Sequence, residues 1–228
     1  ALGGQLKFGT HEYFKEGLRD FMNYLIRQVD KAGVKVFLNT KATPEMVEEF
    51  APDVVVAATG ASPIIPPIPG AHNEGVLNAF NYFENLDSVG EKVVIVGGGL
   101  VGCEAGLDLA QSYHKKVTIL EMASSVASDA WRTHRIPLLE RLEEHVDVRT
   151  GTRVTSIEDN FVRYSDADST EHTVEADTVI LAVGMRTNAE EAEKFRFTAE
   201  DYVQIGDCVK IQNVYGATHT GYWAALDI

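Results

Sequence analysis

An apolar segment runs directly into three glycines at the spacing of a phosphate-binding turn. Residues 93–96 are Val-Val-Ile-Val, and Gly97-x-Gly99-x-x-Gly102 follows. The three positions need glycine for a tight turn, for close backbone approach to a phosphate, and for contact between helix and strand. The N–H groups and positive dipole end of the following helix attract negative charge. We expect the ligand to contact Gly97, Gly98, Gly99, Leu100, Val101 and Gly102.

An acidic residue at the end of the next strand supports this interpretation. After a predicted helix over Leu100–Ser112, residues Lys116–Glu121 are typical of a strand, and Glu121 lies 24 positions after Gly97. About 20 positions are expected before a carboxylate that binds the adenine ribose. The alternative is a tight strand-to-helix turn without a ligand, and Glu121 weighs against it.

Glu121 also favours NADH over NADPH. A carboxylate accepts hydrogen bonds from both ribose hydroxyls but repels the additional phosphate of NADPH, and Met122–Ser125 contains no arginine to offset it. NADPH remains the alternative, because nearby cations could turn toward the ligand. These cations are Lys115, Lys116, Arg132 and Arg135.

The composition excludes several classes of protein. The chain has 228 residues, 45% of them apolar, with a formal net charge of −14. This length permits one large or two modest domains, and the acidic charge argues against nucleic acid or anionic membrane as a partner. No apolar run approaches the ~20 residues of a membrane helix, and no export signal is visible. Cys103 and Cys208 have no CxxC spacing, so we expect a reduced, cytoplasmic protein.

The elements that must position the turn alternate between helices and strands. Before the turn we expect a helix within Glu12–Lys31, a strand at Val34–Leu38, a helix at Thr43–Phe50, a strand at Asp53–Thr59, and a stiff proline-rich connector over Ser62–Asn73. After Glu121 we expect a helix at Ile136–Glu144, strands at Val146–Arg149 and Arg153–Glu158, a hairpin of Phe161–Tyr164 with His172–Val174, strands at Ala176–Gly184 and Tyr202–Ile205, and a helix from about Ala217. The pattern predicts an α/β protein with parallel sheets.

Six segments in this order resemble one family of flavoproteins. They are Leu2–Leu6, Ala58–Gly60, Pro67–Gly70, Gly97–Glu104, Ala182–Asn188 and Ile205–Val209. The chain resembles the carboxy-terminal part of the NADH:flavin oxidoreductases related to 2,4-dienoyl-CoA reductase, enoate reductase and trimethylamine dehydrogenase. More broadly, it is similar to the flavoprotein reductases with two dinucleotide-binding domains. The resemblance covers almost the whole chain.

The resemblance implies a Rossmann-like fold with two domains and two dinucleotides. Residues 1–88 and 189–228 would form a partial FAD-binding domain, and an NAD(P)H-binding domain at 89–188 would be inserted in it. Asp207, after Gly206, would accept a hydrogen bond from the flavin ribityl chain, although a plain Gly-Asp turn is the alternative. The further cofactor-binding residues implied are Thr59, Gly60, Gly184 and Glu104.

Glu104 has two interpretations at this stage. It occupies the family's acidic position after the glycine turn, which the resemblance places near the nicotinamide. The alternative is an exposed glutamate at the start of a helix, where it would interact favourably with the helix dipole.

The chain also departs from the family. Relatives have a strand, a first glycine-rich turn and a ribose-binding acid before the segment that matches Leu2–Leu6, and further upstream a barrel with FMN and a 4Fe-4S cluster. We therefore expect the FAD domain to lack its first strand and glycine turn, and the upstream barrel to be a partner in the same full-length protein. We expect association into a homo-oligomer, because a missing strand exposes the edges of its neighbours.

The leading hypothesis is an NADH-binding electron-entry module that transfers hydride to FAD and passes electrons to the barrel, which reduces an enoyl or enoate substrate. The alternative is a structural module that binds ADP, and a disulfide reductase is disfavoured because no cysteine pair is visible. Hydride transfer needs no protein acid or base, so we nominate no catalytic residue. The seven histidines are scattered and no acidic group has metal-ligand spacing, so we expect no metal site.

Overall fold

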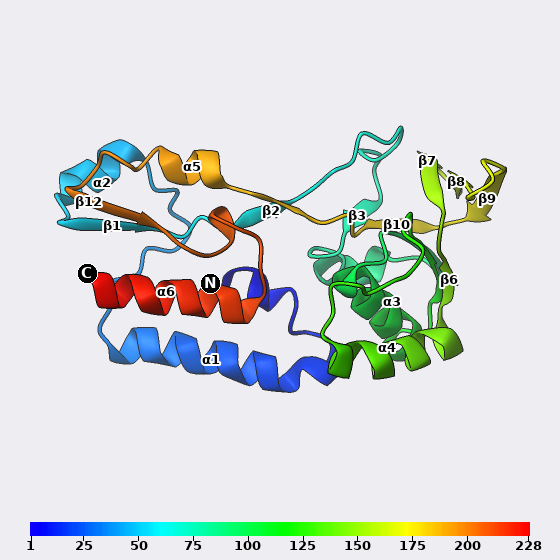
Figure 1. Ribbon diagram of the computed structural model, residues 1–228, viewed down its shortest axis with the longest axis horizontal. Coiled ribbons are helices and arrows are strands. Elements are labelled where there is room, and N and C mark those ends of the chain that lie inside the picture. Colours follow the sequence, from blue (N-terminus) through cyan, green and yellow to red (C-terminus); the bar gives the residue numbers. More distant parts are fainter. The chain divides into compact units, whose positions relative to one another are not determined.

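The computed structural model describes all residues from 1 to 228, which divide into two compact units. The first unit contains Ala1–Lys35 and Ile65–Gly184, and the second contains Val36–Ile64 and Met185–Ile228. Each unit is therefore built from two separate stretches of the chain. Figure 1 shows the elements of both units in the colours of the sequence.

The first unit carries the glycine turn. Its helices are α1 (Glu16–Lys31), α3 (Leu100–Ser112) and α4 (Arg132–His145), with 3-10 turns η1 (Gly4–Lys7), η2 (Tyr13–Lys15) and η3 (Phe83–Ser88). Its strands are β3 (Val76–Asn78), β4 (Lys92–Val96), β5 (Lys116–Leu120), β6 (Asp147–Arg149), β7 (Arg153–Glu158), β8 (Phe161–Ser165), β9 (Glu171–Glu175) and β10 (Thr178–Leu181).

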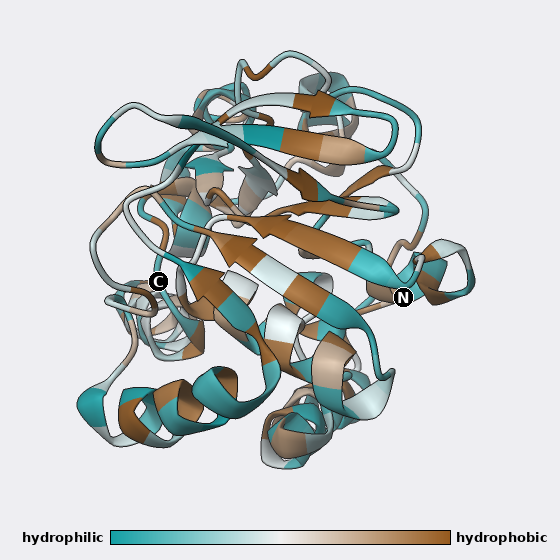
Figure 2. Cartoon of the chain, turned by 90° about the vertical axis from the view of Figure 1, so that its right-hand side faces the viewer, coloured by the Kyte–Doolittle hydropathy of each residue, from teal (hydrophilic) through white to brown (hydrophobic).

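Five strands of this unit form a parallel sheet in the order β3-β10-β4-β5-β6. The register pairs Val93 with Val117 and with Thr178, so β4 lies in the middle with a neighbour on each side. Figure 2 shows hydrophobic residues along these strands. A strand that is covered on both faces has a continuous apolar sequence, which explains the run of β-branched residues in β4.

Alternate residues of the sheet enter two different cores. Val93 and Ile95 of β4 pack in one cluster with residues of α3 and α4, including Leu107 and Leu142. Val94 and Val96 enter the other cluster, together with Val162 and further residues of β7 and β8. Because side chains alternate across a strand, the sheet has helices on one face and other strands on the opposite face.

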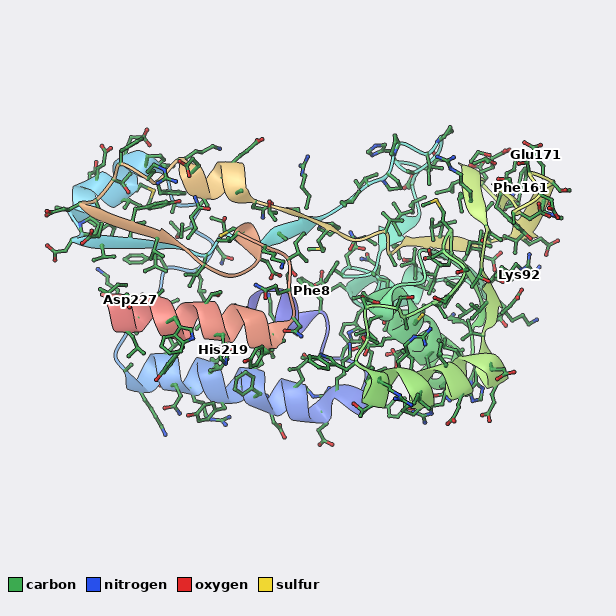
Figure 3. All side chains as sticks on the ribbon, viewed as in Figure 1. Phe8, Lys92, Phe161, Glu171, His219 and Asp227 are labelled. Carbon is green, nitrogen blue, oxygen red and sulfur yellow. The ribbon has the colours of Figure 1, made fainter.

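The strands on that opposite face are β7, β8 and β9, which form an antiparallel sheet with a register shift between Val154 and Ser156. Figure 3 labels Phe161 at the start of β8 and Glu171 at the start of β9. The sheet buries Val162 completely and leaves the residues before and after it more exposed. This alternation is typical of an antiparallel sheet with one face on a core and one face in water.

The second unit has shorter elements. It contains β1 (Val54–Ala57), β2 (Ala61–Pro63), β11 (Met185–Thr187) and β12 (Asp201–Gln204), with α2 (Pro44–Phe50), α5 (Ala189–Glu193), η4 (Gly206–Cys208) and α6 (Val214–Asp227). The strands β1 and β12 pair in parallel, and β2 and β11 pair in antiparallel orientation. Thr43 caps α2 and Asn213 caps α6, each through its side-chain oxygen.

Most elements lie where the sequence predicts them. The helix at Leu100–Ser112 and the α/β class with parallel sheets are confirmed. The strand predicted at Val34–Leu38 is wrong, because this segment forms no regular structure. A β-strand requires a partner strand, and the nearest sheet along the chain consists of β1 and β12 alone. None of the helices combines the length and the apolar character that a membrane crossing requires.

Candidate dinucleotide-binding site

The glycine turn joins β4 to α3 at the carboxyl edge of the parallel sheet. Gly97 has φ +108°, a left-handed conformation that favours glycine, and its N–H donates to the Leu120 carbonyl of the neighbouring strand at 2.9 Å. A Cβ atom at Gly97 would lie 2.4 Å from the Ala182 carbonyl oxygen. A Cβ atom at Gly102 would lie 2.1 Å from the Gly97 carbonyl oxygen. Both positions therefore exclude any larger residue without a backbone shift.

Glu121 lies against the turn, as its position after β5 predicts. One carboxylate oxygen of Glu121 accepts the Gly98 N–H at 2.5 Å, and the other accepts the Ala123 N–H at 2.7 Å. The Glu121 N–H donates to the Arg149 carbonyl of β6 at 2.9 Å, which extends the sheet hydrogen bonding by one residue. The structure therefore brings together the glycines and the acid that the sequence analysis selected. The ribose-binding role of Glu121 stays a prediction.

A second carboxylate at the turn was not foreseen from the sequence. Gly99 directly precedes α3 and provides no capping side chain, and the Leu100 N–H instead donates to Asp129 Oδ1 at 2.8 Å. Asp129 lies in the loop between β5 and α4, 29 positions after Leu100. No local sequence signal distinguishes this aspartate from other loop acids, because its role depends on how the loop returns to the helix.

Glu104 is buried on the second turn of α3, with 4% of its surface exposed. Its carboxylate accepts from Lys15 Nζ at 2.7 Å and lies 3.0 Å from His134 Nε2. The burial excludes the alternative of an exposed glutamate at the helix start. Neither Lys15 nor His134 is predicted as a partner of Glu104 from the sequence, because both come from distant parts of the chain.

Lys15 belongs to a short segment that lies along one face of α3. Three residues of this segment contact the helix. His11 Nε2 lies 3.7 Å from an Asp108 oxygen, the Tyr13 hydroxyl donates to Gln111, and Lys15 pairs with Glu104. Helix positions 104, 108 and 111 share one face. We call residues 11–15 the amino-terminal strap.

The contact between the strap and the helix contains buried polar groups. His11 Nε2 also lies 2.7 Å from the hydroxyl of Tyr82, whose side chain is fully buried. Burial raises the pKa of Tyr82 and the pKa of Asp108, and the hydrogen bond from Ser112 opposes the rise at Asp108. One oxygen each of Glu12 and Asp108 is buried without a hydrogen-bond partner. The contact therefore brings the carboxylates of Glu12, Glu104 and Asp108 close to the side chains of His11 and Lys15.

The carboxyl end of β10 completes the edge of the sheet. Ala182 follows β10, and its N–H donates to the Val96 carbonyl at 2.8 Å, while Gly184 has φ +100°. From β4 the chain continues to β5 on one side, whereas β10 lies on the other side of β4, so the order of the parallel strands reverses at β4. Dinucleotides bind outside the carboxyl ends of the strands at such a switch point.

The four remaining predicted residues lie in the second unit. Thr59 and Gly60 follow β1, while Gly206 and Asp207 follow its parallel neighbour β12, so both pairs leave the same edge of that small sheet. Asn188 ties the first pair, because its N–H donates to the Gly60 carbonyl at 2.9 Å and its side-chain amide donates to the Thr59 carbonyl at 3.0 Å.

The second pair forms a short turn. The Gly206 N–H donates to the hydroxyl of Thr220 on α6 at 3.0 Å, and Asp207 accepts the Gln212 N–H at 3.1 Å. Asp207 is partly exposed and keeps one carboxylate oxygen outside this bond. These loops can supply donors and acceptors to a flavin. A glycine-rich phosphate turn, however, is present only in the first unit.

Neither cysteine has a redox partner. Cys103 and Cys208 are both buried free thiols, and burial raises the pKa of Cys103 to about 12. Because the thiolate is the reactive form, Cys103 is inert at neutral pH. No group of three or more histidine, cysteine or acidic side chains is arranged to hold a metal ion.

With this geometry in place, the fold and the turn define a class of flavoprotein. The chain matches the model of the pyridine nucleotide-disulphide oxidoreductase family over residues 10–221, and it belongs to this family. Membership implies FAD and NAD(H) as cofactors. The glycine turn fits a pyrophosphate, because Gly97, Gly99 and Gly102 carry no side chain that would block close approach to the backbone. The Asp129 carboxylate is the nearest group to the Cβ position of Gly99, at 3.7 Å.

Particular relatives are similar over the whole chain. An NADH oxidase of Thermoanaerobacter brockii is 32% identical over 100% of this chain and 36% of its own length. A cinnamate reductase of Clostridium sporogenes is 32% identical over 100% of this chain and 34% of its own length. A solved structure of 2-naphthoyl-CoA reductase with 2-naphthoyl-CoA superposes with a TM-score of 0.93 at 31% identity, covering 100% of this chain and 35% of that one. The chain thus spans about a third of the length of these relatives.

Proposed function

We propose that this chain is the NADH-binding electron-entry module of a larger flavin-dependent oxidoreductase. The observation that carries the proposal is the glycine turn of residues 97–102 with Glu121 bonded to it at 2.5 Å. FAD, when bound, accepts hydride from NADH and passes electrons onward. In this proposal the electrons go to an upstream barrel with FMN and a 4Fe-4S cluster, where an enoyl or enoate substrate is reduced. The cinnamate reductase and the naphthoyl-CoA reductase support that substrate class.

The residues of the first unit have distinct tasks in this proposal. The N–H groups at the start of α3 bind the pyrophosphate, because they have no acceptor within the helix and lie at the positive end of the helix dipole. Glu121 accepts hydrogen bonds from the adenine ribose and repels the additional phosphate of NADPH. Glu104, held by Lys15 and His134, and Gly184 lie toward the nicotinamide half.

The residues of the second unit serve the flavin. Asp207 would accept a hydrogen bond from the ribityl chain, and the turn of Thr59 and Gly60 would approach the isoalloxazine edge. The parallel pairing of β1 and β12 supports this assignment, since it brings both turns to one edge. No side chain of either unit is assigned as a catalytic acid or base.

The test is calorimetric titration of this chain with NADH, NADPH and ADP, with and without FAD. We expect NADH to bind more tightly than NADPH, and Glu121→Ala to weaken NADH binding by roughly tenfold, the effect of losing hydrogen bonds to a charged group. Glu121→Gln should weaken it less and reduce the preference over NADPH. The control is Glu140→Gln, which removes one charge from an exposed position of α4.

The outcomes separate the candidate functions. NADH binding that depends on Glu121 supports the electron-entry module. Equal affinity for ADP and NADH would favour the structural ADP module, because the nicotinamide half would then contribute nothing. Absence of binding by all three nucleotides would overturn both.

A further inference from the structure

The amino-terminal end of α3, where we propose that the pyrophosphate binds, is already in contact with a carboxylate of the protein, that of Asp129. The Leu100 N–H, which has no acceptor within α3, donates to Asp129 Oδ1 at 2.8 Å. Both carboxylate oxygens of Asp129 also lie over Gly99, at 3.7 and 3.8 Å from the position of an added Cβ atom. The absence of a side chain at Gly99 is the feature that admits a phosphate. The carboxylate therefore occupies the space and the donor that a phosphate needs.

We propose that Asp129 substitutes for the ligand phosphate in the free protein and so determines the affinity of the site for dinucleotides. The inference rests on the proposed function, since it concerns the same turn. A pyrophosphate gains the helix N–H groups only when Asp129 releases them. The measured affinity then reflects the difference between the free energy with which the phosphate binds the helix end and the free energy with which Asp129 binds it.

The loop that presents Asp129 is fixed beside the turn. The Ala127 N–H donates to the Gly98 carbonyl at 2.7 Å, and Arg135 donates to the carbonyls of Val126 and Ala127. Asp129 itself is exposed. Rotation of one exposed side chain is therefore enough to free the helix end, and the loop anchors can remain in place.

Competition at the helix end predicts a selective effect. A ligand without phosphate, such as adenosine, reaches the ribose-binding carboxylate of Glu121 but does not need the Leu100 N–H. Removing the Asp129 carboxylate should therefore strengthen the binding of ADP and NADH and leave the binding of adenosine unchanged. In the free protein, removing Asp129 leaves the helix end without a cap, which lowers thermal stability. The two effects have opposite signs.

The experiment compares Asp129→Ala and Asp129→Asn with the unchanged chain in titrations with ADP, NADH and adenosine. We expect Asp129→Ala to bind ADP and NADH about fivefold more tightly, as the loss of a cap implies, with a lower midpoint of thermal unfolding without ligand. Asp129→Asn keeps an acceptor without the charge and should show a smaller gain. Ser128→Ala controls for changes in the loop, and Glu140→Gln controls for the loss of one negative charge.

Each outcome has a defined meaning. Unchanged ADP affinity in both variants would overturn the inference, and NADH binding that still depends on Glu121 would leave the proposed function intact. Weaker ADP binding would also overturn it, because Asp129 would then help to bind the ligand. If the Asp129 variants also bound adenosine more tightly, the change would not depend on the phosphate, and this result would count against the inference. If Asp129→Ala does not fold, Asp129→Asn decides the question. If the unchanged chain binds no phosphate ligand, the proposed function fails first.

Discussion

The two units differ most in how much core each one builds. In the first unit, both faces of a five-stranded sheet are covered, and two clusters of buried apolar residues result. In the second unit, the buried cluster contains only Ala57, Ala192 and Cys208, with Tyr202 packed against it. The glycine turn of residues 97–102 lies in the unit that has its own core. The loops proposed to bind the flavin lie in a unit whose sheet has only two parallel strands.

The surfaces of the second unit are consistent with its small core. Gly216 is the only buried residue of α6, whereas Tyr215, Tyr222 and Trp223 are each more than half exposed. Val56 in β1 is 42% exposed, although valine in a parallel strand is normally covered. Apolar surface left in water contributes no stabilisation. The comparison teaches that the proposed NADH-binding turn lies in a unit with its own core, whereas the loops proposed to bind the flavin lie in a unit with little buried apolar surface.

The largest expected effect comes from the close contact between α3 and the glycine turn in the first unit. Gly102→Ala places a methyl group 2.1 Å from the Gly97 carbonyl oxygen, so helix and turn must separate. We expect NADH binding to fall by at least about 100-fold and the free energy of unfolding to fall by roughly 3 kcal/mol. Titration and chemical denaturation measure the two quantities.

The matched control for this variant is Gly17→Ala in α1. No atom lies within 4 Å of its added Cβ, and its φ is not positive. Alanine in a helix should raise the free energy of unfolding by roughly 0.5 to 1 kcal/mol and leave NADH binding unchanged. Equal NADH binding by Gly102→Ala and the unchanged chain would show that the turn does not need close contact.

Hydrogen exchange measures the difference in stability between the units. We expect the amides of β1 and β12 to exchange at least about 100-fold faster than those of β4 and β10, because local opening follows local burial. Mass spectrometry of peptic peptides would report both sets in one sample. Equal protection would show that the two units unfold together, and the comparison would then be wrong.

The smallest expected effect concerns Asp108, a buried carboxylate inside the first unit. Burial raises the pKa of Asp108, so the folded protein holds this proton more tightly than the unfolded chain does. The resulting stabilisation is present below the unfolded pKa of about 3.9 and is lost as pH rises through the folded pKa. Asp108→Asn removes the charge and keeps the acceptor for Ser112.

We therefore expect Asp108→Asn to raise the free energy of unfolding by roughly 1 kcal/mol at pH 7 and by less at pH 4. Denaturant unfolding at the two pH values measures the change. Asp87→Asn, the same chemical change at an exposed position, is the control. Destabilisation at pH 7 would show instead that the charge of Asp108 is favourable beside His11.

Local patterns were sufficient where one short segment contains the whole signal. The helix Leu100–Ser112 was predicted with the observed bounds, because its start is set by Gly99 and its residues face a sheet. The start of α4 at Arg132 was missed by four residues, since Arg132 and its neighbours are exposed and polar and give no apolar period. The edge strand Val76–Asn78 was missed because three residues carry no period at all.

The sequence by itself determined the glycine turn, the strand before it, the helix after it and the acid at the end of the next strand. These features follow from backbone geometry and side-chain size within residues 93–121, which any fold of this segment must respect. Only the tertiary structure decided which groups meet at that turn. Asp129 reaches Leu100 across 29 positions and Lys15 reaches Glu104 across 89, and the way the chain returns determines such contacts. The same physical reason explains the unequal cores, because burial depends on which strands find partners.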